Sequence, residues 1–109
     1  MNGRSALSKN SNFGHALKSV RVTKNVIQDQ FEDVSNRTYV SAVERGIKQP
    51  TLPKVDEFAA ILAVHPLTLL VLAYLGRPTE AGISAALETV QQELGLLAMS
   101  GLFTEENQS

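Results

Sequence analysis

Apolar side chains recur at intervals of three and four residues along most of this chain, and this period places them on one face of an α-helix. The pattern begins at residues 13–20, and similar segments follow at 27–34, 39–43 and 52–62. The apolar run 69–75 could by itself also be a buried strand, but a lone strand would have no partner in a chain that is otherwise helical. The pattern therefore predicts an all-α fold.

Residues that favour helix ends lie between these apolar segments. Ser, Thr and Asn side chains cap helix starts, proline suits a first turn, and glycine favours a helix end. The residues at these places are Ser11 or Asn12, Ser35 or Asn36, Gly46, Thr51, Pro66, Gly76 and Thr79. We therefore expect a flexible N-terminal arm over 1–12, a five-helix domain over 13–76, and an additional C-terminal helix with a frayed tail over 77–109.

The C-terminal helix carries an apolar seam like that of a coiled coil. The seam residues, which are four, three, four and three positions apart, are Ile83, Leu87, Val90, Leu94 and Leu97. Two heptads are too short to hold a free coiled coil together. The seam must therefore pack on its own domain or on a second copy of the chain. We expect dimerisation through the seam, and packing on its own domain stays open.

Composition excludes several classes of protein. The 109 residues suffice for one compact domain and an additional element. The absence of cysteine excludes disulfides, thiolate zinc sites and a cysteine nucleophile. The longest apolar run is far shorter than the roughly 18 residues of a membrane-spanning helix, and no apolar segment follows the basic residues near the N-terminus as in a secretory signal. We therefore expect a cytoplasmic protein that does not enter a membrane.

The net charge of −1 conceals two halves of opposite sign. Residues 1–54 contain nine Lys and Arg against four Asp and Glu, a net charge of +5. Beyond Lys54, Arg77 is the single basic residue against seven carboxylates, a net charge of −6. A basic half can lie against a polyanion such as double-stranded DNA, while an acidic half stays in solvent or meets a protein partner.

The segment 28–50 has the pattern of a helix-turn-helix, because two short predicted helices are joined by a tight turn and the second is polar on one side. It also resembles the signature of the phage repressor and Cro type, or xenobiotic response element, family. The resemblance lies in residues 39–46 (YVSAVERG) and in Lys48, Pro50, Thr51 and Leu52. Residues 13–75 correspond to the five-helix DNA-binding domain of that family.

The resemblance implies which side chains meet DNA. On the exposed side of the third helix, base contacts would come from Asn36, Arg37, Thr38 and Ser41. Arg37 is the best candidate for guanine, because a guanidinium fork fits the O6 and N7 acceptors together. Asn36 could bind adenine or cap its helix. Contacts to the DNA backbone would come from Gln28, Lys48, Gln49, Thr51 and the hydroxyl of Tyr39.

Two further implications concern structure. Glu44 resembles the buried acid of the family that pairs with an arginine on the first helix, here Arg21. The chain also departs from the family, since it has two residues fewer between Gln28 and Ser41 and lacks the usual turn glycine. If the turn is shortened, Phe31 fills the apolar site of the second helix, and the register of that helix is left open.

Catalytic and metal-binding patterns are weak by comparison. His15 and His65 have no companions at ligand spacing, and no nucleophile motif or glycine-rich phosphate loop accompanies the serines. We therefore expect no enzyme activity, no metal and no cofactor. The predicted function is that of a sequence-specific transcriptional repressor, a homodimer on a palindromic operator. The alternative is an antitoxin or interaction module whose acidic C-terminal half binds a protein partner.

Overall fold

The computed structural model describes residues 12–76 and 78–101, and within them the secondary structure is helical, with no strand. This confirms the all-α prediction. Of the flexible arm predicted over 1–12, residues 1–11 lie outside the described residues, and Asn12 belongs to the first helix instead. The tail over 102–109 also lies outside the described residues. The elements, in chain order, are α2 (Asn12–Thr23), a 3₁₀ helix η1 (Gln28–Phe31), α3 (Arg37–Glu44), α4 (Leu52–Leu62), α5 (Pro66–Leu75) and α6 (Glu80–Met99).

Side-chain caps fix the starts of three α-helices where the sequence predicted them. The Oδ1 atom of Asn36 accepts a hydrogen bond from the backbone N–H of Tyr39 at 2.8 Å, at the start of α3. Thr51 caps α4 and Thr79 caps α6 in the same way, through their hydroxyl oxygens. Because a good cap stabilises a helix by about 1 kcal/mol, these residues set where each helix begins.

The helix ends are less uniform. Gly46 and Gly76 have φ angles of 82° and 73° and follow α3 and α5, as the sequence predicted. The end of α4 has no glycine, and Ala63 itself takes the left-handed conformation, with a φ of 60°. The residue before it, Leu62, is 1% exposed and belongs to the apolar core.

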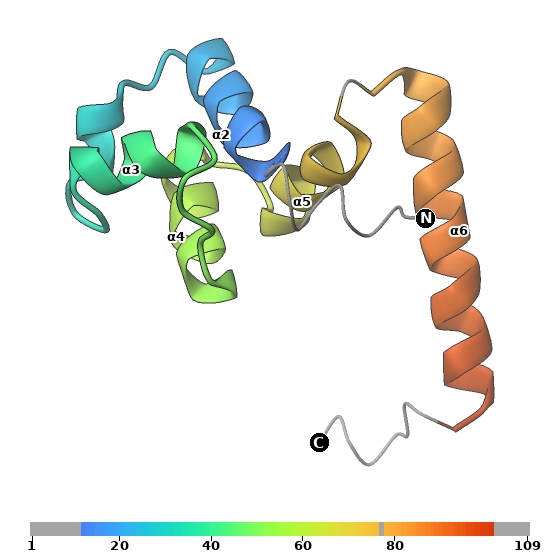
Figure 1. The fold of residues 1–109 in the computed structure, drawn as a ribbon. Coiled ribbons are helices and arrows are strands. Elements are labelled where there is room, and N and C mark those ends of the chain that lie inside the picture. The colour runs from blue at the N-terminus through green and yellow to red at the C-terminus, as the bar shows by residue number, and fades with distance from the viewer. Residues whose placement is uncertain (1–11, 77, 102–109) are drawn as a thin grey trace. The chain divides into compact units, whose positions relative to one another are not determined.

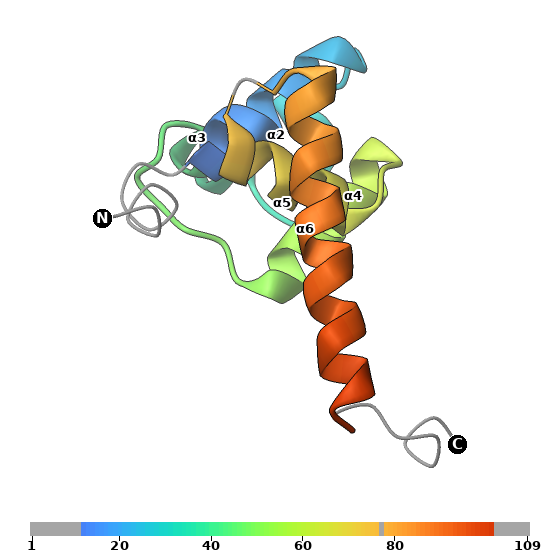
Figure 2. The same ribbon diagram turned by 90° about the vertical axis from the view of Figure 1, so that its right-hand side faces the viewer.

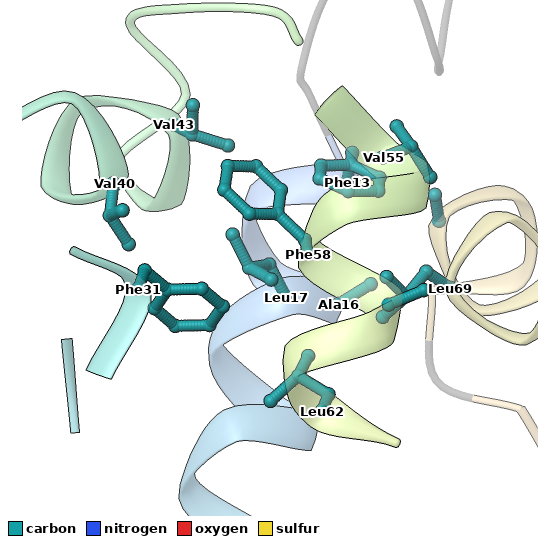
Figure 3. Packing of buried hydrophobic residues seen from close by; sticks show 12 residues of the cluster. Phe13, Ala16, Leu17, Phe31, Val40, Val43, Val55, Phe58, Leu62 and Leu69 are labelled. Atoms are coloured by element: carbon teal, nitrogen blue, oxygen red, sulfur yellow. The ribbon is translucent and has the colours of Figure 1, made fainter. Parts of the chain in front are cut away.

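Each element from α2 to α5, including η1, contributes to one apolar core (Figure 3). Its largest fully buried side chains are Phe31, Phe58, Leu17, Leu62, Leu69, Val40 and Val43. The rings of Phe31 and Phe58 meet edge to face, with their centroids 5.4 Å apart. Burying one such side chain stabilises the fold by roughly 1.5–3 kcal/mol, so this core determines how α3 is held.

A glycine permits α2 to approach the backbone of α3 closely. A Cβ atom built on Gly14 would lie 2.3 Å from the backbone oxygen of Val43 and 2.7 Å from that of Glu44. Neither oxygen belongs to a flexible side chain that could move aside. Gly14 therefore allows α2 to pack directly on the C-terminal end of α3.

The chain divides into two compact units, residues 1–77 and 78–109. In the first, α2, α3, α4 and α5 gather around the core (Figures 1 and 2). In the second, α6 forms a single helix that buries none of its residues. Along its seam Ile83 is half-buried, whereas Leu87, Val90, Leu94 and Leu97 are each 45–49% exposed.

Within the described residues, no single helix is both long enough and apolar enough to cross a membrane. Taken together, α4 and α5 meet the criteria of length and composition, but the two are bent by 107° at the break between them.

Candidate nucleic-acid interface

One edge of α3 is polar and exposed while the other enters the core. Val40, Ala42 and Val43 are buried. Figure 3 shows Val40 and Val43 directed toward the core, on the side where Phe31 and Phe58 lie. Arg37 and Thr38 are exposed at the start of the helix, and Ser41, one turn later, is half-buried. The core therefore fixes which side chains α3 presents to solvent.

Arg37 extends from the first turn of α3. Its side chain is 70% exposed, and its Nε atom lies 3.7 Å from Oδ1 of Asp29, which belongs to η1 and is itself 53% exposed. An ion pair this exposed contributes between about 0 and 1 kcal/mol. Moving the guanidinium group from the carboxylate to a base edge would therefore cost little free energy.

Asn36 is occupied as a helix cap. The sequence left open whether this residue would bind adenine or cap α3, and in the structure its Oδ1 atom accepts the N–H of Tyr39. The side-chain oxygen of an asparagine has two lone pairs and its nitrogen two N–H groups. The cap uses one acceptor site, so base contact by Asn36 stays a prediction.

Glu44 joins α3 to two earlier elements. Its Oε2 atom accepts the Nε–H of Arg21 at 2.6 Å, and its Oε1 atom accepts Nη2–H of the same residue at 3.0 Å. Arg21 also donates from Nη1 to the carbonyl of Val26, at 3.1 Å. The two side chains are only 13% and 4% exposed. The structure thus brings the two residues together as a nearly buried, bidentate pair between α2 and α3.

Gln28 completes this cluster. Its Nε2 atom donates to Oε1 of Glu44 at 3.0 Å. The side-chain amide has a second N–H group, so the bond to Glu44 uses one of two donors. The family resemblance implies that Gln28 contacts a DNA phosphate, and that role stays a prediction, since the structure places the amide against a carboxylate within the protein.

The second helix is shorter than its apolar pattern suggested. It is a single turn of 3₁₀ helix, in which Phe31 is fully buried, while Ile27 lies before it and is 58% exposed. The prediction that residues 27–34 form one helix with its apolar side chains on a single face was therefore wrong. The carbonyl of Phe31 accepts the N–H groups of Val34 and Ser35, which closes one isolated turn, and the chain does not continue from it as a regular helix.

The loop after α3 exposes the side chains that the sequence assigned to phosphates. Lys48, Gln49 and Thr51 are all exposed, and the N–H of Lys48 donates to the carbonyl of Ala42 at 3.3 Å. Thr51 uses its hydroxyl oxygen to cap α4 at Lys54, at 3.3 Å. Lys48 and Gln49 thus lie beside the C-terminal end of α3, with their side chains in solvent.

Tyr39 lies half-buried between the polar edge and the core. The centroid of its ring is 6.4 Å from that of Phe58, and the ring packs against the core cluster. The ring therefore packs inward from the first turns of α3. Contact of the hydroxyl with DNA stays a prediction.

Lys54 was not singled out by sequence, yet it has several partners beside α3. Its Nζ atom donates to the backbone carbonyl of Val34 and lies 3.1 Å from Oε1 of Glu57. The same atom lies 5.8 Å from the centroid of the Tyr39 ring. No sequence motif marks these contacts, because two of the three partners lie 15 or more positions away in the chain.

The sequence of this chain is similar to that of a known control protein. Control protein C.BamHI of Bacillus amyloliquefaciens is 33% identical over 67 residues, which cover 59% of this chain and 83% of the relative. No family model and no solved structure matches the chain.

In the described part of the chain, no three His, Cys, Asp or Glu residues are grouped so as to hold a metal ion.

Proposed function

This chain belongs to the helix-turn-helix transcriptional regulator family that includes control protein C.BamHI, and from that premise we propose that it recognises a specific DNA site through α3. The observation that carries the proposal is the polar edge of α3, where Arg37 and Thr38 are exposed while Val40 and Val43 hold the opposite edge in the core. A helix presented in this way fits the major groove of a duplex.

The charge distribution supports two different kinds of contact. The excess of basic residues in 1–54 attracts any duplex, since phosphate contacts are independent of sequence. Arg37 then supplies discrimination by binding guanine, and Lys48 and Gln49 hold the flanking backbone. The protein regulates transcription by occupancy and acts as a repressor where its site overlaps a promoter.

A homodimer would double these contacts. Two copies related by a twofold axis would bind half-sites about 34 Å apart on a palindromic operator. The apolar seam of α6 supports this arrangement, because Leu87, Val90, Leu94 and Leu97 are all exposed in a single copy. An exposed row of leucine and valine at heptad spacing is stabilised when a second helix covers it.

The charge of α6 favours a second candidate for the occupant of this seam. Glu80, Glu88 and Glu93 lie on the helix, and the stretch 80–99 contains no Lys or Arg. A basic amphipathic segment of a partner protein would therefore find opposite charge around an apolar face, as in an antitoxin. Native mass spectrometry of the purified chain separates the two candidates, since the first gives a dimer alone and the second a monomer alone.

Selection of bound fragments from random DNA tests the central proposal. We expect enrichment of one sequence, with affinity that falls as salt rises. Arg37→Ala should relax the base preference, while Lys48→Ala should weaken binding to all duplexes alike and lower the slope of log affinity against log salt by about 0.9. Failure of the wild-type protein to bind any duplex at low ionic strength would refute the proposal.

A further inference from the structure

The ammonium group of Lys54 lies at a junction of three elements. Lys54 belongs to the first turns of α4, and its side chain is 30% exposed. It donates to the carbonyl of Val34, in the turn before α3, and lies 5.8 Å from the ring centroid of Tyr39, on α3 itself. Glu57, one turn further along α4, lies 3.1 Å from the same nitrogen.

The turn that Lys54 contacts is tight and contains no glycine. Five residues, 32–36, connect η1 to α3, and their sequence is EDVSN. The N–H groups of Val34 and Ser35 both donate to the Phe31 carbonyl, so the backbone reverses here within a few residues. The carbonyl of Val34 is the acceptor for Lys54, and it lies two residues before the cap of α3.

The aromatic contact adds a second constraint on the same end of α3. A cation within about 6 Å of a ring centroid is attracted by the ring, more strongly when water is partly excluded. The Tyr39 ring also packs against Phe58, with centroids 6.4 Å apart. Lys54 and Phe58, both on α4, therefore hold Tyr39 by a polar and an apolar contact, and Tyr39 lies in the turn of α3 that carries Arg37 and Thr38.

We propose that Lys54 is a positioning residue that fixes the N-terminal end of α3 for base recognition, and that its charge acts within the protein rather than on a DNA phosphate. The inference rests on the proposed function. A lysine near the start of α4, beside Thr51, would otherwise be expected to bind phosphate. The two roles differ in what they do to salt dependence, because only a phosphate ligand releases a counterion from DNA.

Binding measurements on the full chain distinguish these roles. Three variants are compared with the wild type on the selected site and on a scrambled duplex, each over a series of salt concentrations: Lys54→Gln, Lys54→Arg and, as the control for a phosphate ligand, Lys48→Gln. We expect Lys54→Gln to lower the ratio of specific to non-specific affinity by roughly tenfold, as for loss of one hydrogen bond to a charged group. Its salt slope should stay at the wild-type value.

Lys54→Arg should restore most of the specificity, because a guanidinium keeps both the charge and the N–H donors. Lys48→Gln should instead weaken binding to both duplexes equally, and it should lower the slope of log affinity against log salt by about 0.9. If Lys54→Gln behaves like Lys48→Gln, the proposal is overturned and Lys54 is a phosphate ligand.

A second measurement needs no DNA. NMR spectra of the free protein should show that Lys54→Gln shifts the ring protons of Tyr39 and the amides of residues 34–37, and that Lys54→Arg shifts them less. Unchanged spectra would refute the positioning role. Should the wild type bind no duplex, the proposed function fails, and this measurement still decides whether Lys54 holds the turn.

Discussion

Replacing Gly14 by alanine sets two known effects of opposite sign against each other. Alanine is favoured over glycine by about 0.8–1.0 kcal/mol in a helix interior, which is an upper limit for Gly14 in the first turn of α2. Against this, the new Cβ would lie 2.3 Å from the Val43 oxygen and 2.7 Å from the Glu44 oxygen. Overpacking costs typically about 1–3 kcal/mol and more where the obstructing atoms cannot move. Both atoms are backbone, so α2 and α3 must separate and the cost should lie near the upper end of this range, about 3 kcal/mol. Subtracting the gain of about 1 kcal/mol from helix propensity leaves an expected net loss of about 2 kcal/mol.

Urea denaturation followed by tyrosine fluorescence measures this loss in the first unit alone. The chain has two tyrosines and no tryptophan, and both tyrosines, Tyr39 and Tyr74, lie in the first unit. With a denaturant slope of about 1–2 kcal/mol per molar for a domain of this size, the midpoint should fall by roughly 1–2 M.

The matched control is the same substitution in α6. A Cβ atom added to Gly95 meets nothing within 4 Å. Gly95→Ala should therefore raise the helix content of α6, by circular dichroism, and leave the tyrosine-detected midpoint unchanged. A rise in the midpoint of Gly14→Ala would show that helix propensity dominates, and the inferred close contact of α2 with α3 would be wrong.

Three further predictions follow from the contacts of α3 and α6. Glu44→Ala should lower the free energy of unfolding by roughly 3–5 kcal/mol, because it leaves the charge of Arg21 buried without a partner; a loss below 1 kcal/mol in the same urea titration would contradict this. Asn36→Ala should cost about 1 kcal/mol through the lost cap, and a variant of unchanged stability with altered base preference would instead assign Asn36 to adenine. Leu94→Glu should convert a homodimer to monomer in native mass spectrometry while the tyrosine-detected midpoint stays constant, and a persistent dimer would place the interface elsewhere.

Local interactions made the helix starts predictable. Asn36, Thr51 and Thr79 cap helices because the donor each side chain satisfies lies three residues along the chain, and that geometry depends on little else. The exposed side of α3 followed from its apolar period, since burial of Val40 and Val43 leaves the other edge in solvent.

Long-range contacts explain what sequence reasoning missed. The apolar spacing of Ile27 and Phe31 is compatible with a helical turn, but the 3₁₀ turn begins only after Ile27, so Phe31 alone of the two reaches the core. Gly14 lies in an apolar helical pattern that does not mark it as special. A larger residue is excluded there by the backbone of α3, which lies 29 or more positions later in the chain. Lys54 carries no motif either, because its partners on the turn and on α3 are brought to it by folding.

The near-complete burial of the Arg21 and Glu44 side chains makes salt titrations of this protein easy to interpret. Mobile ions screen charges in solvent within about 10 Å at 0.1 M ionic strength, but they screen a buried pair far less. Added salt should therefore leave the docking of α3 on α2 intact over the range in which attraction to a polyanion disappears. The slope of the loss of affinity across such a series then reports how many DNA phosphates the protein contacts, without a contribution from loosening of the fold.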